Sequence, residues 1–70
     1  MKAYVYQLFH VSMRGEMGQT DVDWGLFTSL PLVREVILKS NDNPEDFDCY
    51  RHPLNPQGHY VPTPVQIFRK

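Results

Sequence analysis

Three side chains in the second half of the chain have the chemistry of metal ligands or nucleophiles: Cys49, His52 and His59. A structural zinc site needs four ligands, usually with paired Cys or His residues at tight spacing. Cys49 and His52 would lie on opposite faces of a regular strand, because side chains alternate along it. A cysteine–histidine nucleophile meets the same objection, and it also requires an orienting group and an oxyanion site. We therefore expect a buried thiol and two surface histidines, with no metal and no cofactor.

Two pairs of carboxylates are spaced so that each pair shares a face: Asp21 with Asp23, and Asp46 with Asp48. Such pairs can hold Mg²⁺ or act as acid and base. No glycine-rich phosphate loop and no lysine at motif spacing accompanies them. One interpretation is a solvated strand face and a turn. The functional interpretation is docking, since an acidic patch speeds association with a basic surface and selects the partner. We predict no catalytic residue.

Charge is unevenly distributed along a chain whose net charge is -1. The stretch between Ser40 and Tyr50 holds four acids and no base, and the chain contains no basic block of the kind that binds phosphate backbones. Tyr4 and Tyr6 occupy positions at which nucleic-acid bases stack on some sheets, but such platforms normally come with basic grooves. Packing of these tyrosines in the core or at an edge is therefore favoured over binding of single-stranded nucleic acid, which stays an alternative.

Length and cysteine content restrict the class of protein. Seventy residues make one small domain, which buries only about 60% of the surface that its unfolded chain exposes. A single cysteine rules out an internal disulfide and favours a reducing, cytoplasmic setting. The first apolar run, residues 3–11, is too short and too polar for a signal sequence or a membrane span.

The first half of the chain predicts two strands. Residues 3–12 are apolar on both faces, which is typical of a strand inside a sheet. A loop over residues 13–20 follows, and its two methionines either fold back onto the sheet or form an exposed contact surface. Residues 21–27 form the second strand, with Val22, Trp24 and Leu26 expected on the core face. Gly25 indicates a bulge or a close approach by a neighbour.

A helix follows directly. Thr28 or Ser29 is the expected N-terminal cap, its hydroxyl accepting a bond from the first turn, and Pro31 suits that turn. Apolar residues recur at three- and four-residue spacing up to Ile37. The segment Asn41–Pro44 should end the helix. A helix of this length is not stable alone, so it must lie across the Trp24 face of the sheet.

The remainder predicts a third strand over residues 46–52 and a proline-rich tail over 53–70, with a possible edge strand at 65–68. The expected fold is α+β: a small two-layer sandwich with an antiparallel sheet of three to four strands, in the order β-β-α-β-(β), and one helix packed on one face. Residues 1–52 would form the single domain.

Three sequence features carry a resemblance to known proteins. A tyrosine-rich strand ends in His10-Val11, a Gly-x-Phe-x-Ser element at residues 25–29 leads into the helix, and a Pro-acidic turn at 44–50 leads into a strand. Over about residues 3–52 the chain resembles small bacterial and phage β-β-α-β domains of unknown function. The resemblance implies the fold and transfers no functional residue.

These observations favour a non-enzymatic protein-binding module, a small cytoplasmic inhibitor or adaptor that docks on a larger protein. A phage protein that blocks a host nucleic-acid-binding enzyme, such as an anti-CRISPR or anti-restriction protein, fits this profile. A structural homodimer paired through a strand edge is a further alternative. The residues expected to contact the partner lie in the loop, the second strand, the acidic stretch and the tail: Met13, Arg14, Met17, Asp21, Asp23, Asp42, Glu45, Asp46, Asp48 and Tyr60.

Overall fold

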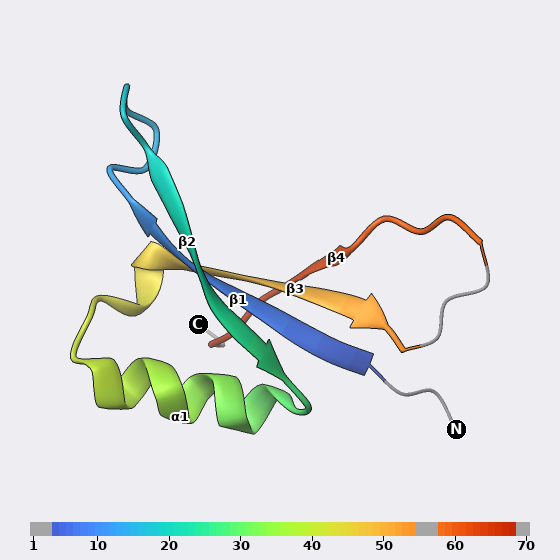
Figure 1. Ribbon diagram of the computed structural model, residues 1–70. Coiled ribbons are helices and arrows are strands. Elements are labelled where there is room, and N and C mark those ends of the chain that lie inside the picture. The colour runs from blue at the N-terminus through green and yellow to red at the C-terminus, as the bar shows by residue number, and fades with distance from the viewer. Residues whose placement is uncertain (1–3, 55–57, 69–70) are drawn as a thin grey trace.

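A computed structural model describes residues 4–54 and 58–68 of the chain. Its elements are listed here in chain order: β1 (Tyr4–Ser12), β2 (Thr20–Phe27), α1 (Leu30–Ser40), a 3-10 turn η1 (Pro44–Asp46), β3 (Phe47–Pro53) and β4 (Thr63–Val65). The strands form one antiparallel sheet in the order β2-β1-β3-β4, and α1 lies along one side of it (Figure 1). The predicted α+β fold is confirmed, and β1 lies inside the sheet as expected.

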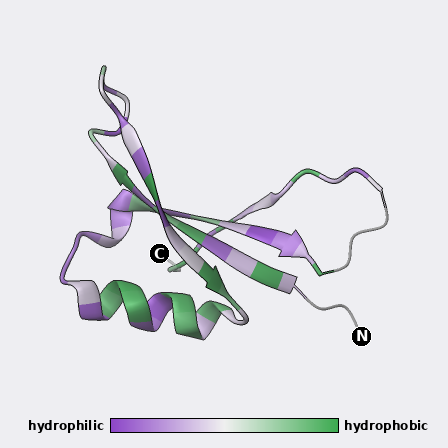
Figure 2. Ribbon diagram, viewed as in Figure 1, coloured by the Kyte–Doolittle hydropathy of each residue, from purple (hydrophilic) through white to green (hydrophobic). Residues whose placement is uncertain are grey.

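The core lies between α1 and the face of the sheet that α1 covers. Val33 and Ile37 of the helix are fully buried, as is Leu8 of the central strand. Phe47 and Cys49 extend this cluster along β3, and Trp24 packs against it from β2. Figure 2 shows the apolar residues of α1 beside a hydrophilic segment that leads from the helix to β3. The predicted bed for the helix, the Trp24 face, is therefore correct.

A β-bulge in β2 changes the predicted pattern of that strand. Leu8 pairs with Gly25 and Phe9 pairs with Asp23, so Trp24 is the extra residue. Gly25 has a φ of 111°, and a Cβ added at this position would meet no atom within 4 Å, which favours the bulge over a close approach. Beyond the bulge the alternation is reversed: Phe27 packs against the core, and Leu26 is 65% exposed. The expectation that Leu26 shares the core face is wrong, because one inserted residue shifts every later side chain to the opposite face.

The helix begins and ends close to its predicted limits. Ser29 is the N-terminal cap residue, with Pro31 in the first turn, but the Ser29 hydroxyl makes no capping hydrogen bond. Asn41 ends the helix in the left-handed conformation with a φ of 63°, as its short polar side chain allows. Lys39 Nζ lies 2.8 Å from Glu35 Oε1 on the outer face. This pair raises the pKa of Lys39 and lowers the pKa of Glu35, chiefly through their hydrogen bond.

The C-terminal segment joins the sheet two residues earlier than predicted. β4 spans Thr63–Val65 and pairs with residues 49–51 of β3, whereas the sequence suggested an edge strand at 65–68. After Val65 the chain leaves the strand, and Ile67 enters the core. Arg34 of the helix fixes this turn by donating a hydrogen bond of 2.6 Å from Nε to the carbonyl oxygen of Ile67. The requirement to bury Ile67 explains why pairing stops at Val65. No helix in the described part of the chain has the length and apolar content needed to cross a membrane.

Candidate protein-docking surface

The loop between β1 and β2, residues 13–19, is called the hairpin loop below. Met13 adopts a φ of 58° and begins a tight reversal in which Glu16 N donates to Met13 O at 3.0 Å. The Gln19 side chain closes the reversal, since its Oε1 accepts a bond of 2.8 Å from Gly15 N. Met17 is 97% exposed and Met13 is 57% exposed. The methionines therefore do not fold back onto the sheet, and the alternative of an exposed apolar surface describes the loop.

The segment that follows α1 and includes the first two residues of β3, residues 42–48, is called the acidic turn below. Its conformation is held by local polar contacts: Ser40 Oγ accepts from Asp42 N at 3.1 Å, and Asn43 Oδ1 accepts from Glu45 N at 3.0 Å. The second contact caps η1, in which a proline occupies the first turn. These contacts order the backbone from which the carboxylates of the acidic turn project.

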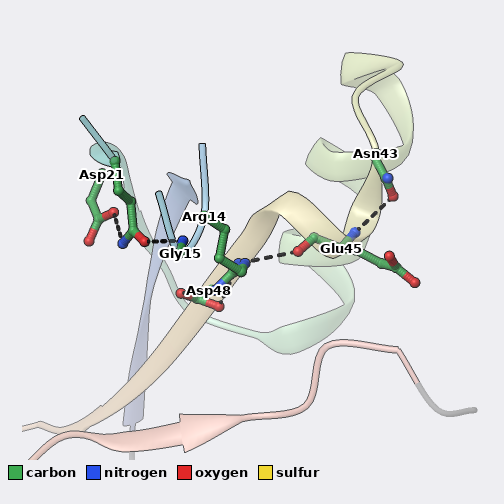
Figure 3. Close-up of polar contacts among 7 residues, drawn as sticks. Arg14, Gly15, Asp21, Asn43, Glu45 and Asp48 are labelled. Carbon is green, nitrogen blue, oxygen red and sulfur yellow. Dashed lines mark hydrogen bonds and ion pairs between the residues drawn. The ribbon is translucent and has the colours of Figure 1, made fainter. Parts of the chain in front are cut away.

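Arg14 joins the hairpin loop to the acidic turn. Its two terminal nitrogens donate to both carboxylate oxygens of Asp48, each at 3.1 Å, and Nη2 also donates to the carbonyl oxygen of Glu45 at 3.2 Å (Figure 3). Arg14 is 34 positions from Asp48 and 31 positions from Glu45 in sequence. A planar guanidinium suits this arrangement, because it can bind a carboxylate through two parallel bonds and still offer a further donor. The hairpin loop and the acidic turn thus form one continuous surface.

The charges around Arg14 are predominantly negative. The hydrogen bond to Asp48 raises the pKa of Arg14, and the charges of Asp48, Asp46 and Asp21 add to that effect. Asp21 also accepts a bond of 3.3 Å from Gln19 of the hairpin loop. Asp42 and Glu45 are exposed, and Asp46 and Asp48 are half-buried. One cation therefore stands among several carboxylates, and the surface keeps a net negative charge beside two exposed thioethers.

Asp23 borders this surface but is also used to build the fold. Phe9 of the central strand pairs with Asp23 on one side and with Asp48 on the other, so both carboxylates flank the same point of the sheet. Asp23 Oδ1 accepts a bond of 2.8 Å from Gly25 N within the bulge, and Oδ2 accepts one of 3.3 Å from Gln7 Nε2. Its carboxylate stabilises the bulge, a role that the strand pattern did not indicate.

Tyr60 is the one predicted contact residue that the fold places elsewhere. Its hydroxyl lies 3.1 Å from Nδ1 of His52, and His52 pairs with Val5, four positions along β1 from Phe9. At about 3.3 Å per residue, that places it roughly 13 Å along the strand. The opposite nitrogen of His52 lies 2.9 Å from Gln7 Oε1. Sequence analysis did not predict that Gln7 and His52 belong to a polar cluster. Strand alternation could have indicated it, because alternation puts both side chains on the face away from α1.

The two tyrosines considered for nucleic-acid stacking, Tyr4 and Tyr6, already contact other residues of the protein. Tyr6 packs against the core. The guanidinium carbon of Arg51 lies over the Tyr4 ring, 4.3 Å from its centroid. The preferred interpretation, packing in the core or at an edge, is therefore confirmed for Tyr6, while Tyr4 engages in a cation–π contact.

Two of the three potential metal ligands, Cys49 and His52, lie on opposite faces of β3, as strand alternation predicts. Cys49 is buried on the helix side of β3, with 3% of its surface exposed, and burial raises the pKa of its thiol to about 11. His52 lies on the opposite face, with Gln7 and Tyr60. Within residues 4–54 and 58–68, no three His, Cys, Asp or Glu side chains gather as a metal site would require.

A pocket of about 320 Å³ adjoins the acidic turn on its β4 side. Its walls come from the acidic turn and β3 on one side and from β4 and the following residues on the other. The lining residues are Pro44, Glu45, Phe47, Asp48, Cys49, Tyr50, Pro64, Val65, Gln66, Ile67 and Phe68. Cys49 is the one thiol among them, and burial raises its pKa to about 11.

A strand-paired homodimer would form at an edge of the sheet, and β2 is one of the two edge strands. The bulge at Trp24 interrupts this edge, and Asp21 and Asp23 place carboxylates along it. Bulges and charged residues are the usual protection of edge strands against pairing with another chain. These features protect the β2 edge against such pairing; the opposite edge of the sheet is β4.

Comparison of the chain with protein-family models, with curated protein sequences and with solved structures finds no match in any of the three.

Proposed function

We propose that this protein is a non-enzymatic protein-binding module, a small inhibitor or adaptor that acts in the cytoplasm. Its docking surface combines the hairpin loop with the acidic turn. The observation that supports this most is the bidentate contact of Arg14 with Asp48, which places the exposed Met17 loop and a row of carboxylates on one surface. Methionine is adaptable and enriched at interfaces.

The partner in this proposal is a larger protein with a basic surface. A nucleic-acid-binding enzyme is such a partner, because its substrate groove must carry excess positive charge. Carboxylates on a fixed turn offer that groove complementary charge without the entropy cost of ordering a flexible segment. In a phage setting, the enzyme blocked would belong to a CRISPR or restriction system.

The proposal is tested by comparing charge reversals that change the net charge equally. Asp42→Lys and Glu45→Lys each reverse an exposed charge on the acidic turn, and Glu35→Lys reverses an exposed charge on the outer face of α1. Each full-length variant is immobilised and exposed to host lysate, and the captured proteins are quantified by mass spectrometry. A partner retained by wild type and Glu35→Lys but lost several-fold from both turn variants supports the proposal. Equal capture by all three variants contradicts it.

A photo-crosslinker locates the contact independently of charge. It is placed at position 17 in the hairpin loop or at position 38 on α1, where Leu38 is also largely exposed. Crosslinking to the captured protein from position 17, and not from 38, is expected. The reverse result would assign docking to the helix face and overturn the proposed surface.

A further inference from the structure

The sulfur atoms of the described residues occupy two opposite environments. The thioether of Met17 stands at the hairpin loop with 97% of the residue exposed, and Met13 is 57% exposed. The thiol of Cys49 belongs to the core cluster with Leu8 and Ile37 and borders the pocket beside β4, with 3% of the residue exposed. An accessible cysteine is usually oxidised before a methionine. Because Cys49 is buried and Met17 is exposed, that order is not expected for these two residues.

The chemistry of the two groups strengthens that difference. Oxidation of a thiol proceeds through the thiolate, and burial raises the pKa of Cys49 to about 11. At neutral pH the thiol is therefore protonated, and only 3% of the residue is exposed. A thioether needs no deprotonation, so its rate depends on access alone, and Met17 has almost the access of a free amino acid.

We infer that Met17 is a redox-sensitive contact of the docking surface, oxidised by a peroxide to methionine sulfoxide. One peroxide oxygen is transferred to sulfur: the S–O bond forms, the O–O bond breaks, sulfur is oxidised by two electrons, and the peroxide is reduced to water or an alcohol. The product is polar where the thioether was apolar. Its consequence for binding rests on the proposed function, whereas the selectivity of the oxidation does not.

The hairpin loop is built so that this change leaves the fold intact. Backbone bonds from Glu16 N to Met13 O and from Gln19 N to Glu16 O, at 3.0 and 3.2 Å, hold the reversal without the Met17 side chain. Gln19 and Arg14 anchor the loop through their own polar contacts. Oxidation of Met17 therefore changes the chemistry of the surface and not the position of the loop.

Selectivity is measured on the folded, full-length chain with limiting hydrogen peroxide. Trypsin cleaves after Lys2, Arg14 and Arg34, so Met1, Met13 and Met17 fall in three separate peptides. Mass spectrometry should show the Met17 peptide gaining one oxygen faster than the Met13 peptide, as the exposures of 97% and 57% predict, with Cys49 unmodified. Oxidation of Cys49 before Met17 in the folded chain, or equal rates for Met13 and Met17, overturns the assignment.

The effect on docking is measured with Met17→Leu, which keeps the apolar character and lacks the sulfur. Peroxide treatment should lower capture of the partner by wild type roughly tenfold, the loss expected when one apolar contact becomes polar. It should leave capture by Met17→Leu unchanged, while Met13→Leu should stay as sensitive as wild type.

Two failures are distinguishable. If Met17 is oxidised selectively but capture is unchanged, the redox-sensitive contact is wrong and the docking proposal stands. If no variant captures any partner before peroxide is added, the proposed function and the redox-sensitive contact fall together, while the peptide map still decides the site of oxidation.

Discussion

Nε2 of His52 lies 2.9 Å from Oε1 of Gln7, a residue 45 positions earlier in the chain. The contact is one step in a chain of polar groups that crosses the sheet on the face opposite α1, from Tyr60 through His52 and Gln7 to Asp23. An ionised carboxylate only accepts hydrogen bonds, so the Gln7 amide must donate to Asp23 and turn its oxygen to His52. His52 must then donate from Nε2, and in the neutral ring Nδ1 accepts from the Tyr60 hydroxyl.

This direction predicts the tautomer of His52. In the neutral form, nitrogen chemical shifts measured by NMR should show the proton on Nε2, whereas the exposed His59 serves as a reference without these contacts. Asp23→Ala should let the Gln7 amide reverse and produce a mixture of tautomers at His52. A predominant Nδ1–H form in the wild-type protein would show that the chain of bonds does not run in this direction.

The Arg14 contact predicts that the hairpin loop and the acidic turn lose their order together. Arg14→Ala removes the bonds to Asp48 and to the Glu45 carbonyl. Because the pair is exposed, we expect little change in the midpoint of urea unfolding. Amide hydrogen exchange should increase in residues 15–19 and 43–48, and capture of the partner should fall.

Arg14→Lys is the matched variant for this prediction. It keeps the charge but cannot form two parallel bonds to a carboxylate. Faster exchange in both segments, intermediate between wild type and Arg14→Ala, is expected. Faster exchange confined to the hairpin loop would mean that Arg14 does not hold the acidic turn.

The bulge in β2 predicts a specific requirement for glycine at position 25. A residue with a Cβ at a φ of 111° is strained even where no neighbour is close, so Gly25→Ala should lower the free energy of unfolding by about 1–3 kcal/mol. Urea unfolding followed by Trp24 fluorescence measures the change. Thr20→Ala, at the exposed start of the same strand, should stay within about 0.5 kcal/mol of wild type. If Gly25→Ala and Thr20→Ala lowered the free energy of unfolding equally, the bulge would not require glycine at position 25.

Burial of Cys49 predicts how stability depends on alkaline pH. The folded-state pKa of about 11 exceeds the ordinary value of 9.0, so the folded chain holds the thiol proton to higher pH than the unfolded chain. The stabilisation is complete below pH 9 and is lost progressively as the pH rises toward 11. Ultraviolet titration of thiolate absorbance should give a midpoint near 11 in the native protein and near 9 in denaturant.

Cys49→Ala provides the control for that dependence. The remaining titrating groups are common to both proteins, so the difference in unfolding free energy between them isolates the thiol. That difference should decrease between pH 9 and 11. A difference independent of pH over this range would show that the thiol is not shielded from solvent in the folded state.

The sequence by itself determined the elements and their type. Alternation of apolar residues located β1 and β3, and helical spacing with Pro31 and Asn41 located α1, because these signals depend on local backbone geometry. Alternation alone placed Cys49 and His52 on opposite faces. The face of Leu26 was mispredicted, because a bulge is an inserted residue whose position depends on pairing with β1. The C-terminal end of β4 was also mispredicted, because the strand stops at Val65 and Ile67 is buried in the core.

Only the tertiary structure decided the candidate surface. The acids and methionines were visible in the sequence, but nothing local indicated that Arg14 binds Asp48 or that Gln7 bridges Asp23 and His52. Those contacts join residues from different strands, and they exist only once the antiparallel register brings the strands side by side. Long-range polar contacts follow from register, and register is set by the burial of the whole apolar face, not by any single stretch of sequence.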